Sequence, residues 1–418
     1  IPNAPSIVTV TDNVGTIQNL TSGQSTNDNT PTLTGVTEAD SIVTIRDGNT
    51  VIGTTTSDAS GNWSFTPAPA LSEGSHSLTA TVTDGAGNIS PAAPPFVVVV
   101  DTLAPAAPSI TSVIDDQPGS TLLTNGQLTN DAQPTLSGTT EANAIVTIRS
   151  NGTIIGTANA DGSGSWSFTP TNALAQGENI FTVTATDAAG NTSGASASFT
   201  VLVDSVAPSA PVILTVQDNT APTTGPISNG QISNESRPAL SGTGEVGATI
   251  TVLSDGQPIG TTIVGAGGTW NFTPSTALGN GLHTLTVTAT DSAGNTSLPS
   301  GGFTYTVDTQ APAAPVITQV ADDVGPLTGN LNNGQATNDA RPTLSGTAEA
   351  NSTVRIYDNG SFIGSITADS TGAWIFTPGT ALSNGNHTLT VTATDAAGNV
   401  SSTSAGFNIV VDTVAPLA

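Results

Sequence analysis

Short stretches in which apolar and polar residues alternate recur along the whole chain and predict β-strands. In the last quarter of the sequence, Leu389, Val391 and Ala393 fall on one face of such a stretch, and threonines fall on the other. Turn signals rich in Gly, Asn and Asp separate these stretches, and no helical periodicity is present. The pattern favours a two-sheet β-sandwich. The seven short strands expected there are 316–320, 341–346, 353–357, 361–367, 373–378, 387–394 and 407–411.

The strand pattern repeats four times with a period of just over one hundred residues. The linker aspartates Asp101, Asp204, Asp308 and Asp412 are 103, 104 and 104 residues apart, and the 4 tryptophans show the same spacings. A unit of this length is large enough to hold its own hydrophobic core. We therefore expect an all-β fold of four tandem seven-stranded β-sandwich domains that form an extended rod. The expected domains are 1–101, 102–204, 205–308 and 309–412, with 413–418 as the start of the next linker.

Each repeat contains one tryptophan on a predicted strand, two residues before a phenylalanine on the same face. Aromatic residues on the same face of a strand usually pack in the core of a sandwich. The alternative is that the rings are exposed and stack on sugars. Rows of threonine on the penultimate predicted strand are typical of a solvated sheet face, with ice or carbohydrate binding as the alternative. The tryptophans are Trp63, Trp166, Trp270 and Trp374.

The charge balance is strongly acidic and excludes some partners. The chain has 31 Asp and Glu residues against 5 Arg and no Lys, which gives a formal net charge of −26. A basic surface for nucleic acid is therefore absent, and anionic membranes would repel the chain. No apolar segment approaches the roughly 20 residues of a membrane span, and no signal peptide is visible. Cysteine and methionine are both absent, so we expect no disulfides and interpret the sequence as an interior fragment.

The acidic residues recur at the same positions in every repeat, and alternating strand directions would sort them onto the two ends of each domain. The glutamate loop after the second strand and the acidic turn before the last strand share the N-terminal pole, whereas the linker aspartate lies at the C-terminal pole. Three carboxylates would thus converge at each junction, with no Lys or Arg nearby to balance their charge. A divalent cation could balance it, and a site made of oxygen ligands suits structural Ca²⁺ better than Mg²⁺. The alternative is solvated turn acids. The glutamates are Glu38, Glu141, Glu245 and Glu349, and the acidic turns are 84–88, 187–191, 291–295 and 395–399. The predicted sets are Asp101 with Glu141 and Asp187, Asp204 with Glu245 and Asp291, and Asp308 with Glu349 and Asp395.

A second group of acids marks both ends of the long connection between the first two strands of each repeat. A structureless loop of this length needs an explanation. The acids could close it around another Ca²⁺, supply more ligands to the junction, or serve only as turn residues. The pairs are Asp12 and Asp28, Asp115/Asp116 and Asp131, Asp218 and Glu235, and Asp322/Asp323 and Asp339.

The sequence contains no recognisable catalytic motif, so we do not expect an enzyme. The sequence has no cysteine nucleophile, no GxSxG or HExxH motif and no phosphate-binding loop. His76, His283 and His387 recur at one position, where the second repeat has Asn179, and are interpreted as surface residues. Asp47, Asp255 and Asp358 are interpreted as hairpin-turn residues.

Four motifs together resemble the bacterial immunoglobulin-like repeats of giant, type I-secreted surface adhesins of Gram-negative bacteria, which include BapA-like and SiiE-like proteins. They are VDTxAPxAP, NDxRPTLSGTAEAN, GxWxFTP and TVTATDAAGN, and they cover every repeat. The resemblance implies tandem immunoglobulin-like extender domains that bind Ca²⁺ through aspartates near the junctions and hold a rod between the cell surface and an adhesive tip. The third repeat departs from the motif around Glu245 and at Glu235. The junction site should survive there, but the second site is in doubt.

The leading hypothesis is a monomeric extracellular spacer in which Ca²⁺ fixes Pro-rich linkers, so that neighbouring repeats are its main partners. Direct binding of host glycans or matrix is the first alternative and would require one repeat to carry a distinct aromatic or charged patch, which the sequence does not show. Homophilic self-association is the second alternative and stays open. The spacer hypothesis also predicts that the site of Asp412 is incomplete.

Overall fold

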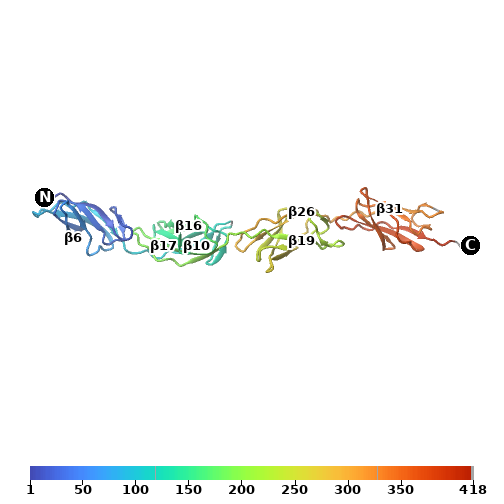
Figure 1. Ribbon diagram of the computed structural model, residues 1–418, viewed down its shortest axis with the longest axis horizontal. Coiled ribbons are helices and arrows are strands. Elements are labelled where there is room, and N and C mark those ends of the chain that lie inside the picture. Colours follow the sequence, from blue (N-terminus) through green and yellow to red (C-terminus); the bar gives the residue numbers. More distant parts are fainter. Residues whose placement is uncertain (118, 327, 416–418) are drawn as a thin grey trace. The chain divides into compact units, whose positions relative to one another are not determined.

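The structure is a computed structural model that describes residues 1–117, 119–326 and 328–415. Residues 416–418 of the expected final linker lie outside the described residues. The chain divides into two compact units, Ile1–Val206 and Ala207–Ala418. Each unit contains two successive β-domains, and Figure 1 shows strands along the described chain. The described residues include no helix that is long and apolar enough to cross a membrane.

Each domain consists of nine strands in the described residues. Domain 1 contains β1 (Ser6–Asp12), β2 (Gln18–Asn19), β3 (Gln24–Thr26), β4 (Thr32–Val36), β5 (Ile42–Asp47), β6 (Thr50–Thr56), β7 (Asn62–Phe65), β8 (Gly74–Thr83) and β9 (Phe96–Val100). Domain 2 contains β10 (Ser109–Asp115), β11 (Thr121–Leu122), β12 (Gln127–Thr129), β13 (Thr135–Thr139), β14 (Ile145–Ser150), β15 (Thr153–Asn159), β16 (Ser165–Phe168), β17 (Gly177–Thr186) and β18 (Phe199–Val203).

The second unit repeats the same order of strands. Domain 3 contains β19 (Val212–Asp218), β20 (Gly225–Pro226), β21 (Ile232–Ser233), β22 (Ala239–Thr243), β23 (Thr249–Ser254), β24 (Gln257–Ile263), β25 (Thr269–Phe272), β26 (Gly281–Thr290) and β27 (Phe303–Val307). Domain 4 contains β28 (Val316–Asp322), β29 (Gly329–Asn330), β30 (Gln335–Thr337), β31 (Thr343–Thr347), β32 (Thr353–Asp358), β33 (Ser361–Thr367), β34 (Ala373–Phe376), β35 (Gly385–Thr394) and β36 (Phe407–Val411).

Two sheets face each other in every domain, as the alternating pattern predicts. In domain 1 one sheet has the order β2-β1-β4-β7 and the other has the order β3-β9-β8-β5-β6. Along β8, Leu78, Ala80 and Val82 are buried while the threonines between them are half-buried on the other face. This two-residue period is what a strand with one packed face produces. The prediction of four β-sandwich domains is confirmed.

The tryptophans belong to the core, and the sugar-platform alternative for them is wrong. Trp63, Trp166, Trp270 and Trp374 are only 1–3% exposed. A glycine on the neighbouring strand makes room for each indole. A methyl group on Gly346, for example, would lie 2.0 Å from the carbonyl oxygen of Val316 and 2.4 Å from Cζ2 of Trp374. Only a residue without a β-carbon fits between strand and ring.

The expected seven strands are all present, but each domain has two more. Both additional strands lie in the long connection, which was expected to lack structure. In domain 4, β29 pairs antiparallel with β28, and β30 pairs parallel with the last strand β36. The parallel pairing places the end of the long connection beside the linker aspartate, a proximity that the alternating pattern does not encode.

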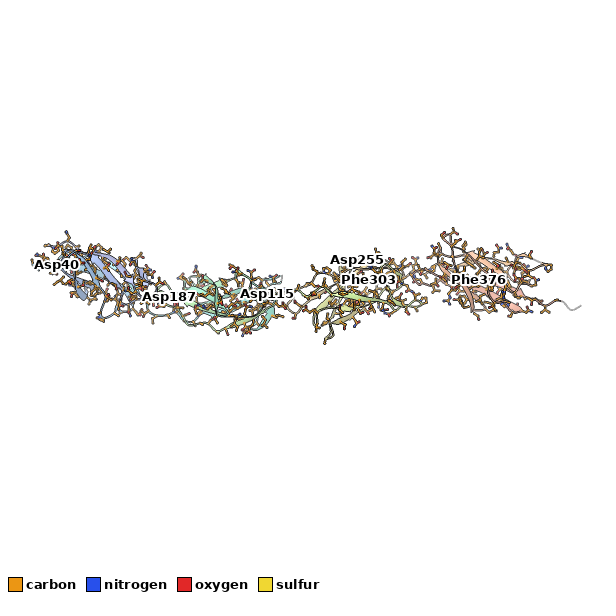
Figure 2. All side chains as sticks on the ribbon, in the orientation of Figure 1. Asp40, Asp115, Asp187, Asp255, Phe303 and Phe376 are labelled. Carbon is orange, nitrogen blue, oxygen red and sulfur yellow. The ribbon has the colours of Figure 1, made fainter. Side chains whose placement is uncertain are left out.

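The strand directions confirm the assignment of loops to the two poles. β1 is antiparallel to β4, β4 to β7, β5 to both β6 and β8, and β8 to β9. The glutamate loop and the acidic turn therefore share the N-terminal pole of each domain. The long connection and the linker aspartate share the C-terminal pole. Figure 2 shows Asp187 and Asp115 at opposite ends of domain 2.

Candidate functional site at the domain junctions

The linker aspartate follows directly after the last strand of each domain and is held by the parallel strand pair. The N–H of Asp101 donates to the carbonyl oxygen of Thr26 at 2.9 Å, which extends the pairing of β3 with β9. Oδ1 of Asp101 accepts a hydrogen bond from the N–H of Leu103 at 3.1 Å. The carboxylate thus shapes the first turn of the linker. Asp204, Asp308 and Asp412 form the same two-residue turn with Val206, Gln310 and Val414.

The acidic turn is closed by its own aspartate. Oδ1 of Asp187 accepts hydrogen bonds from the N–H groups of Ala189 and Asn191, each at 2.9 Å, and Oδ2 accepts from Nδ2 of Asn191 at 2.8 Å. Asp84 makes the same three contacts in domain 1. There the hydrogen bonds from Asn88 hold the pKa of Asp84 below its ordinary value, because they stabilise the ionised carboxylate. Asp291 and Asp395 close equivalent turns.

The structure brings the linker aspartate and the acidic turn of the next domain together within each unit. Between domains 1 and 2, Nδ2 of Asn191 donates to the carbonyl oxygen of Asp101 at 2.8 Å, and the N–H of Asn27 donates to the carbonyl oxygen of Ala189 at 3.1 Å. Between domains 3 and 4, the corresponding distances are 2.7 Å for Asn399 to Asp308 and 3.0 Å for Asn234 to Ala397. The linker aspartate thus contacts its neighbour through its backbone carbonyl.

Two kinds of asparagine at the junction are missing from the predicted sets. One ends the acidic turn, and the other lies at the end of the long connection. The sequence does carry a signal, because both asparagines occupy the same position in every repeat. Asparagine is so common in turns that its recurrence alone does not indicate an interdomain contact.

The predicted glutamates lie at the same pole as the acidic turn but make no hydrogen bond to it among the described residues. Glu141 and Glu349 are exposed, and their side chains make no hydrogen bond to any residue that the structure describes. Their carbonyl oxygens accept from Ala144 at 3.3 Å and Ser352 at 3.1 Å, so they also shape their own loop. Glu245 is exposed as well, and its carbonyl oxygen accepts from Ala248.

A finished three-carboxylate site is not present among the described residues. Within the ranges 1–117, 119–326 and 328–415, no three His, Cys, Asp or Glu side chains are placed to hold one metal ion. Asp204 belongs to the first unit and Glu245 and Asp291 to the second, and each unit is described separately. The junction calcium sites therefore stay a prediction.

The acids of the long connection are buried and organise that connection. Asp12 and Asp28 are each only 2% exposed. Thr26 joins them, because its Oγ1 donates to Oδ2 of Asp12 at 2.8 Å and accepts from the N–H of Asp28 at 3.0 Å. Oδ2 of Asp28 in turn accepts from the N–H of Asn13 at 2.8 Å. Both carboxylates are thus stabilised by hydrogen bonds within the domain.

The same arrangement recurs in the other three domains, including the third. A hydroxyl joins the two acids in each case, and Ser233 takes this role beside Glu235. Asp116 and Asp323 donate their N–H groups to the second acid of their pair. These contacts explain the recurring acids as loop residues, and the second calcium site stays a prediction. The joined pairs are Asp115 with Asp131, Asp218 with Glu235, and Asp322 with Asp339.

The expectation of surface histidines is wrong for His76 and His387, which are only 6% and 4% exposed. Nδ1 of His76 lies 2.6 Å from Oδ2 of Asp47, and Nε2 lies 2.7 Å from the carbonyl oxygen of Ser72. Burial by itself lowers the pKa of His76, but the hydrogen bonds to these two acceptors outweigh it and raise the pKa above its ordinary value. The hairpin aspartates Asp47, Asp255 and Asp358 each bind a histidine in addition to forming a turn.

The two-sheet fold with its repeated polar junctions defines a tandem array of immunoglobulin-like domains. The family described as bacterial Ig-like domain matches residues 17–102, 106–205, 209–309 and 313–413, and the chain belongs to this family. No protein of curated function matches the chain.

Three solved structures show what the fold is similar to. The tetra-tandem repeat from the extending region of a large adhesion protein is 23% identical and covers 99% of this chain and 100% of its own, with a TM-score of 0.35. The BSP domain of a biofilm-associated protein is 12% identical, with coverages of 99% and 97% and a TM-score of 0.18. The fibronectin(III)-like modules of CbhA from Clostridium thermocellum are 17% identical, with coverages of 44% and 90% and a TM-score of 0.31. The family assignment rests on the domain match.

Proposed function

We propose that this chain is a structural spacer in the stalk of a bacterial cell-surface adhesin that serves cell adhesion and biofilm formation. Its domains transmit position and force and perform no catalysis, and the protein acts outside the cell after type I secretion. The observation that carries this proposal is the repeated hydrogen bond between successive domains, from Asn191 to Asp101 and from Asn399 to Asp308. A spacer needs such junctions, because loose linkers would let the domains reorient freely.

We further propose that Ca²⁺ binds at these junctions and stiffens them. Calcium takes six to eight oxygen ligands, which include carboxylates, carbonyl groups and water. Asp101 and Glu141 would hold the ion together with Asp187, whose Oδ2 accepts one hydrogen bond and keeps a lone pair. The chain has no lysine and only 5 arginines against 31 acidic residues, so few cationic side chains are available to compete with a bound ion. The donor set thus fits calcium chemistry.

The free energy expected from one calcium site favours stiffening of the junction, and not folding of the domains, as the role of the ion. Extracellular modules bind Ca²⁺ with Kd values of about 10⁻⁴–10⁻³ M. At roughly ten times Kd, one site stabilises its junction by about 1.4 kcal/mol. Each domain already buries a full core around its tryptophan. Calcium should therefore change the freedom of the linkers while the domains stay folded.

Small-angle scattering of the chain with Ca²⁺ and with EGTA tests the proposal. In EGTA we expect the maximum dimension to decrease and the distribution of interatomic distances to broaden, while the far-UV circular dichroism spectrum stays constant. An unchanged scattering curve would contradict calcium stiffening. Loss of the dichroism signal would show that the ion is needed for folding instead.

One observation favours a second function, direct ligand binding by domain 4. The sequence showed no distinct patch, but the structure corrects this point. Phe362 is 51% exposed, Arg355 lies 4.7 Å above its ring centroid, and Tyr357 makes an edge contact with the same ring at 6.0 Å. Domains 1 to 3 have Val51, Ile154 and Pro258 at the position of Phe362. An exposed aromatic ring with a guanidinium suits an acidic sugar.

Glycan-array binding of the whole chain and of its Phe362→Ala variant separates the two functions. A specific signal that disappears in the variant would support ligand binding by this patch. A signal that the variant retains would exclude the patch, and no signal in either protein would leave the spacer function as the sole proposal.

A further inference from the structure

A cavity of about 360 Å³ lies in domain 2 beside the hairpin of β14 and β15. Its volume falls within the range of about 300–1,000 Å³ that is typical of small-molecule sites. All of its lining residues belong to domain 2, and they come from the hairpin, from the loop that precedes β17 and from β17 itself. The polar ones that matter below are Ser150, Thr153, Asn172 and Asn179.

The two buried polar residues of this cavity replace a histidine–aspartate pair that the other domains carry. Asn179 occupies the position that His76 has in domain 1, and Ser150 occupies the position of Asp47. In domain 1 the imidazole spans the distance between Oδ2 of Asp47 at 2.6 Å and the carbonyl oxygen of Ser72 at 2.7 Å. An amide and a hydroxyl are smaller than an imidazole and a carboxylate, so the replacement leaves space in domain 2. The pairs in domains 3 and 4 are His283 with Asp255 and His387 with Asp358.

Hydrogen bonds hold the buried pair in place and leave it with free acceptor sites. Ser150 is 7% exposed and Asn179 is 2% exposed. Oγ of Ser150 donates to Oδ1 of Asn179 at 3.1 Å. Nδ2 of Asn179 donates to the carbonyl oxygens of Ala175 at 2.8 Å and Gly177 at 3.1 Å. The polar protons of both side chains are thus used, whereas Oγ and Oδ1 keep unused lone pairs, so a ligand that reaches them must donate hydrogen bonds.

Two further polar side chains line the exposed part of the cavity. Thr153 and Asn172 are exposed, and neither side chain forms a hydrogen bond with another residue that the structure describes. Domains 1, 3 and 4 have Pro69, Thr276 and Thr380 at the position of Asn172. Domain 2 therefore differs from the other three domains at both asparagines of this cavity, the buried one and the exposed one.

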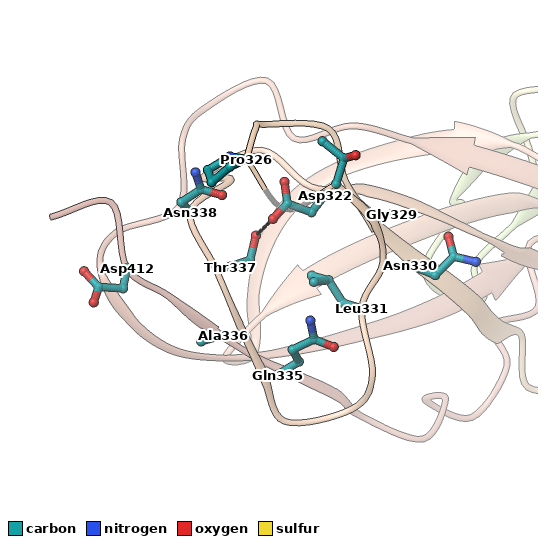
Figure 3. Close-up of a pocket in the computed structure, with 11 residues that line it drawn as sticks. Asp322, Pro326, Gly329, Asn330, Leu331, Gln335, Ala336, Thr337, Asn338 and Asp412 are labelled. Carbon is teal, nitrogen blue, oxygen red and sulfur yellow. Dashed lines mark hydrogen bonds between the residues drawn. The ribbon is translucent and has the colours of Figure 1, made fainter. Parts of the chain in front are cut away.

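The cavity of domain 2 is uncharged, in contrast to a larger cavity of about 460 Å³ in domain 4 (Figure 3). Asp322 and Asp412 line the cavity in domain 4, and Thr337 donates to Asp322 there at 2.6 Å. In domain 2, a bound ammonium group would find no carboxylate among the described lining residues, and a bound carboxylate would find no cation. A buried charge without a partner is costly. The cavity of domain 2 therefore suits an uncharged ligand.

We propose that this cavity binds one unit of a neutral sugar, a function that goes beyond the spacer function and does not depend on it. Hydroxyl groups of the sugar donate to Oγ of Ser150 and Oδ1 of Asn179. The exposed Thr153 and Asn172 exchange hydrogen bonds with the remaining hydroxyl groups, and the less polar face of the ring packs on Leu174. A neutral sugar combines the donors, the lack of charge and the apolar face that this lining requires.

NMR titration of the 418-residue chain with glucose, galactose, mannose and N-acetylglucosamine tests the proposal, with N-acetylneuraminic acid as the charged comparison. We expect at least one neutral sugar to shift the amide resonances of residues 150–155 and 170–179 saturably. The usual binding free energy per ligand atom gives a Kd of about 1–10 mM for a single sugar unit. The charged sugar should bind about tenfold more weakly or less, because its carboxylate has no cation in the cavity.

Three variants locate the bound sugar. Ser150→Asp with Asn179→His installs the pair of domain 1, fills the cavity and should lower the affinity about tenfold or more, while the indole resonance of Trp166 reports that the domain stays folded. Asn172→Thr introduces the residue of domains 3 and 4 and should weaken binding about 2- to 13-fold through the loss of one hydrogen bond. Asn159→Thr makes the same change at an exposed position of β15 outside the cavity and should leave the affinity unchanged.

Several results would overturn the proposal. The absence of saturable shifts with all four neutral sugars would show that the cavity holds only water. Equal affinity in the filled variant would place the sugar elsewhere on the chain, and equal affinity of the charged sugar would refute the requirement for an uncharged ligand. If the filled variant does not fold, the comparison of Asn172→Thr with Asn159→Thr decides, and equal affinity of these two variants would exclude the cavity.

Discussion

Nδ2 of Asn399 lies 2.7 Å from the backbone carbonyl oxygen of Asp308, which precedes it by 91 residues and belongs to the preceding domain. The same nitrogen also donates to Oδ2 of Asp395 at 2.9 Å. One asparagine side chain therefore closes its own turn and joins two domains. Asn191 does the same between domains 1 and 2.

Replacing Asn399 with alanine should loosen the junction between domains 3 and 4. The variant loses the interdomain hydrogen bond, and about 0.5–1.5 kcal/mol is the usual net value of such a contact. Exchange of the Asn234 amide, which bonds Ala397 across the same junction, should accelerate by roughly 2- to 13-fold. NMR-detected hydrogen exchange measures this.

Asn88→Ala is the matched control, because it makes the same change in a turn whose amide bonds only Asp84 among the described residues. It should leave exchange at Asn234 unchanged. Equal acceleration by both variants would show that the Asn399 contact does not couple the domains.

Domain 1 should lose stability as the pH rises from about 6 to 8. Both ring nitrogens of His76 face acceptors, and only the protonated imidazole can donate to both. Its pKa is raised above the ordinary 6.5, so its contribution is complete below that pH and is lost as the pH passes the folded-state pKa. Urea titrations followed through the resonances of domain 1 at several pH values measure the change.

Domain 2 supplies the control for this pH effect. Asn179 replaces the histidine there, accepts from Ser150 at 3.1 Å and donates to the carbonyl oxygen of Ala175 at 2.8 Å. The double substitution His76→Asn with Asp47→Ser should remove the pH dependence of domain 1 between pH 6 and 8. Greater stability of native domain 1 at the higher pH would refute the prediction.

Calcium binding should depend on the linker carboxylates. The interdomain hydrogen bond should not depend on them, because it uses the backbone carbonyl groups. Asp101→Asn and Asp308→Asn keep the backbone carbonyl groups that Asn191 and Asn399 contact, and remove one negative charge each. Each variant should lower the calcium stoichiometry by one in isothermal titration calorimetry. Asp412→Asn is the control and should leave the stoichiometry unchanged. Undiminished stoichiometry in the first two variants would remove the linker aspartates from the sites.

Gly346→Ala should unfold or strongly destabilise domain 4. The added methyl group would lie 2.0 Å from the carbonyl oxygen of Val316 and 2.4 Å from the Trp374 ring, so strand and indole would have to separate. We expect a loss of about 3 kcal/mol or more. Chemical denaturation followed through domain 4 resonances measures it. Gly379→Ala, where the methyl group meets nothing within 4 Å, should change stability by less than about 0.5 kcal/mol.

The fold was largely predictable because each strand signal is local. The predicted strands 361–367 and 407–411 coincide with β33 and β36. The core position of the tryptophans also followed from the two-residue period. The short strands β29 and β30 were missed, since strands of two or three residues carry no measurable alternation.

The candidate site was predicted in its location but not in its contacts. Strand direction placed Asp308 and Asp395 at facing poles of neighbouring domains, and the structure joins those poles through Asn399. The sequence suggested carboxylates as the contacting groups, because charge is visible in a sequence. In the structure, the contact is a hydrogen bond from a side-chain amide to a backbone carbonyl group. The amino-acid composition does not indicate that these two groups meet.

The sequence by itself determined four repeats, their sheets, their cores and the pole at which each acidic residue lies, because these follow from periods of two and of about one hundred residues. Only the tertiary structure decided how the poles meet. The parallel pairing of β30 with β36 brings residues 337 and 411 together across more than seventy positions. Such a pairing depends on the closure of the whole domain, so it sets the donor and acceptor at each pole in a way that local sequence cannot encode.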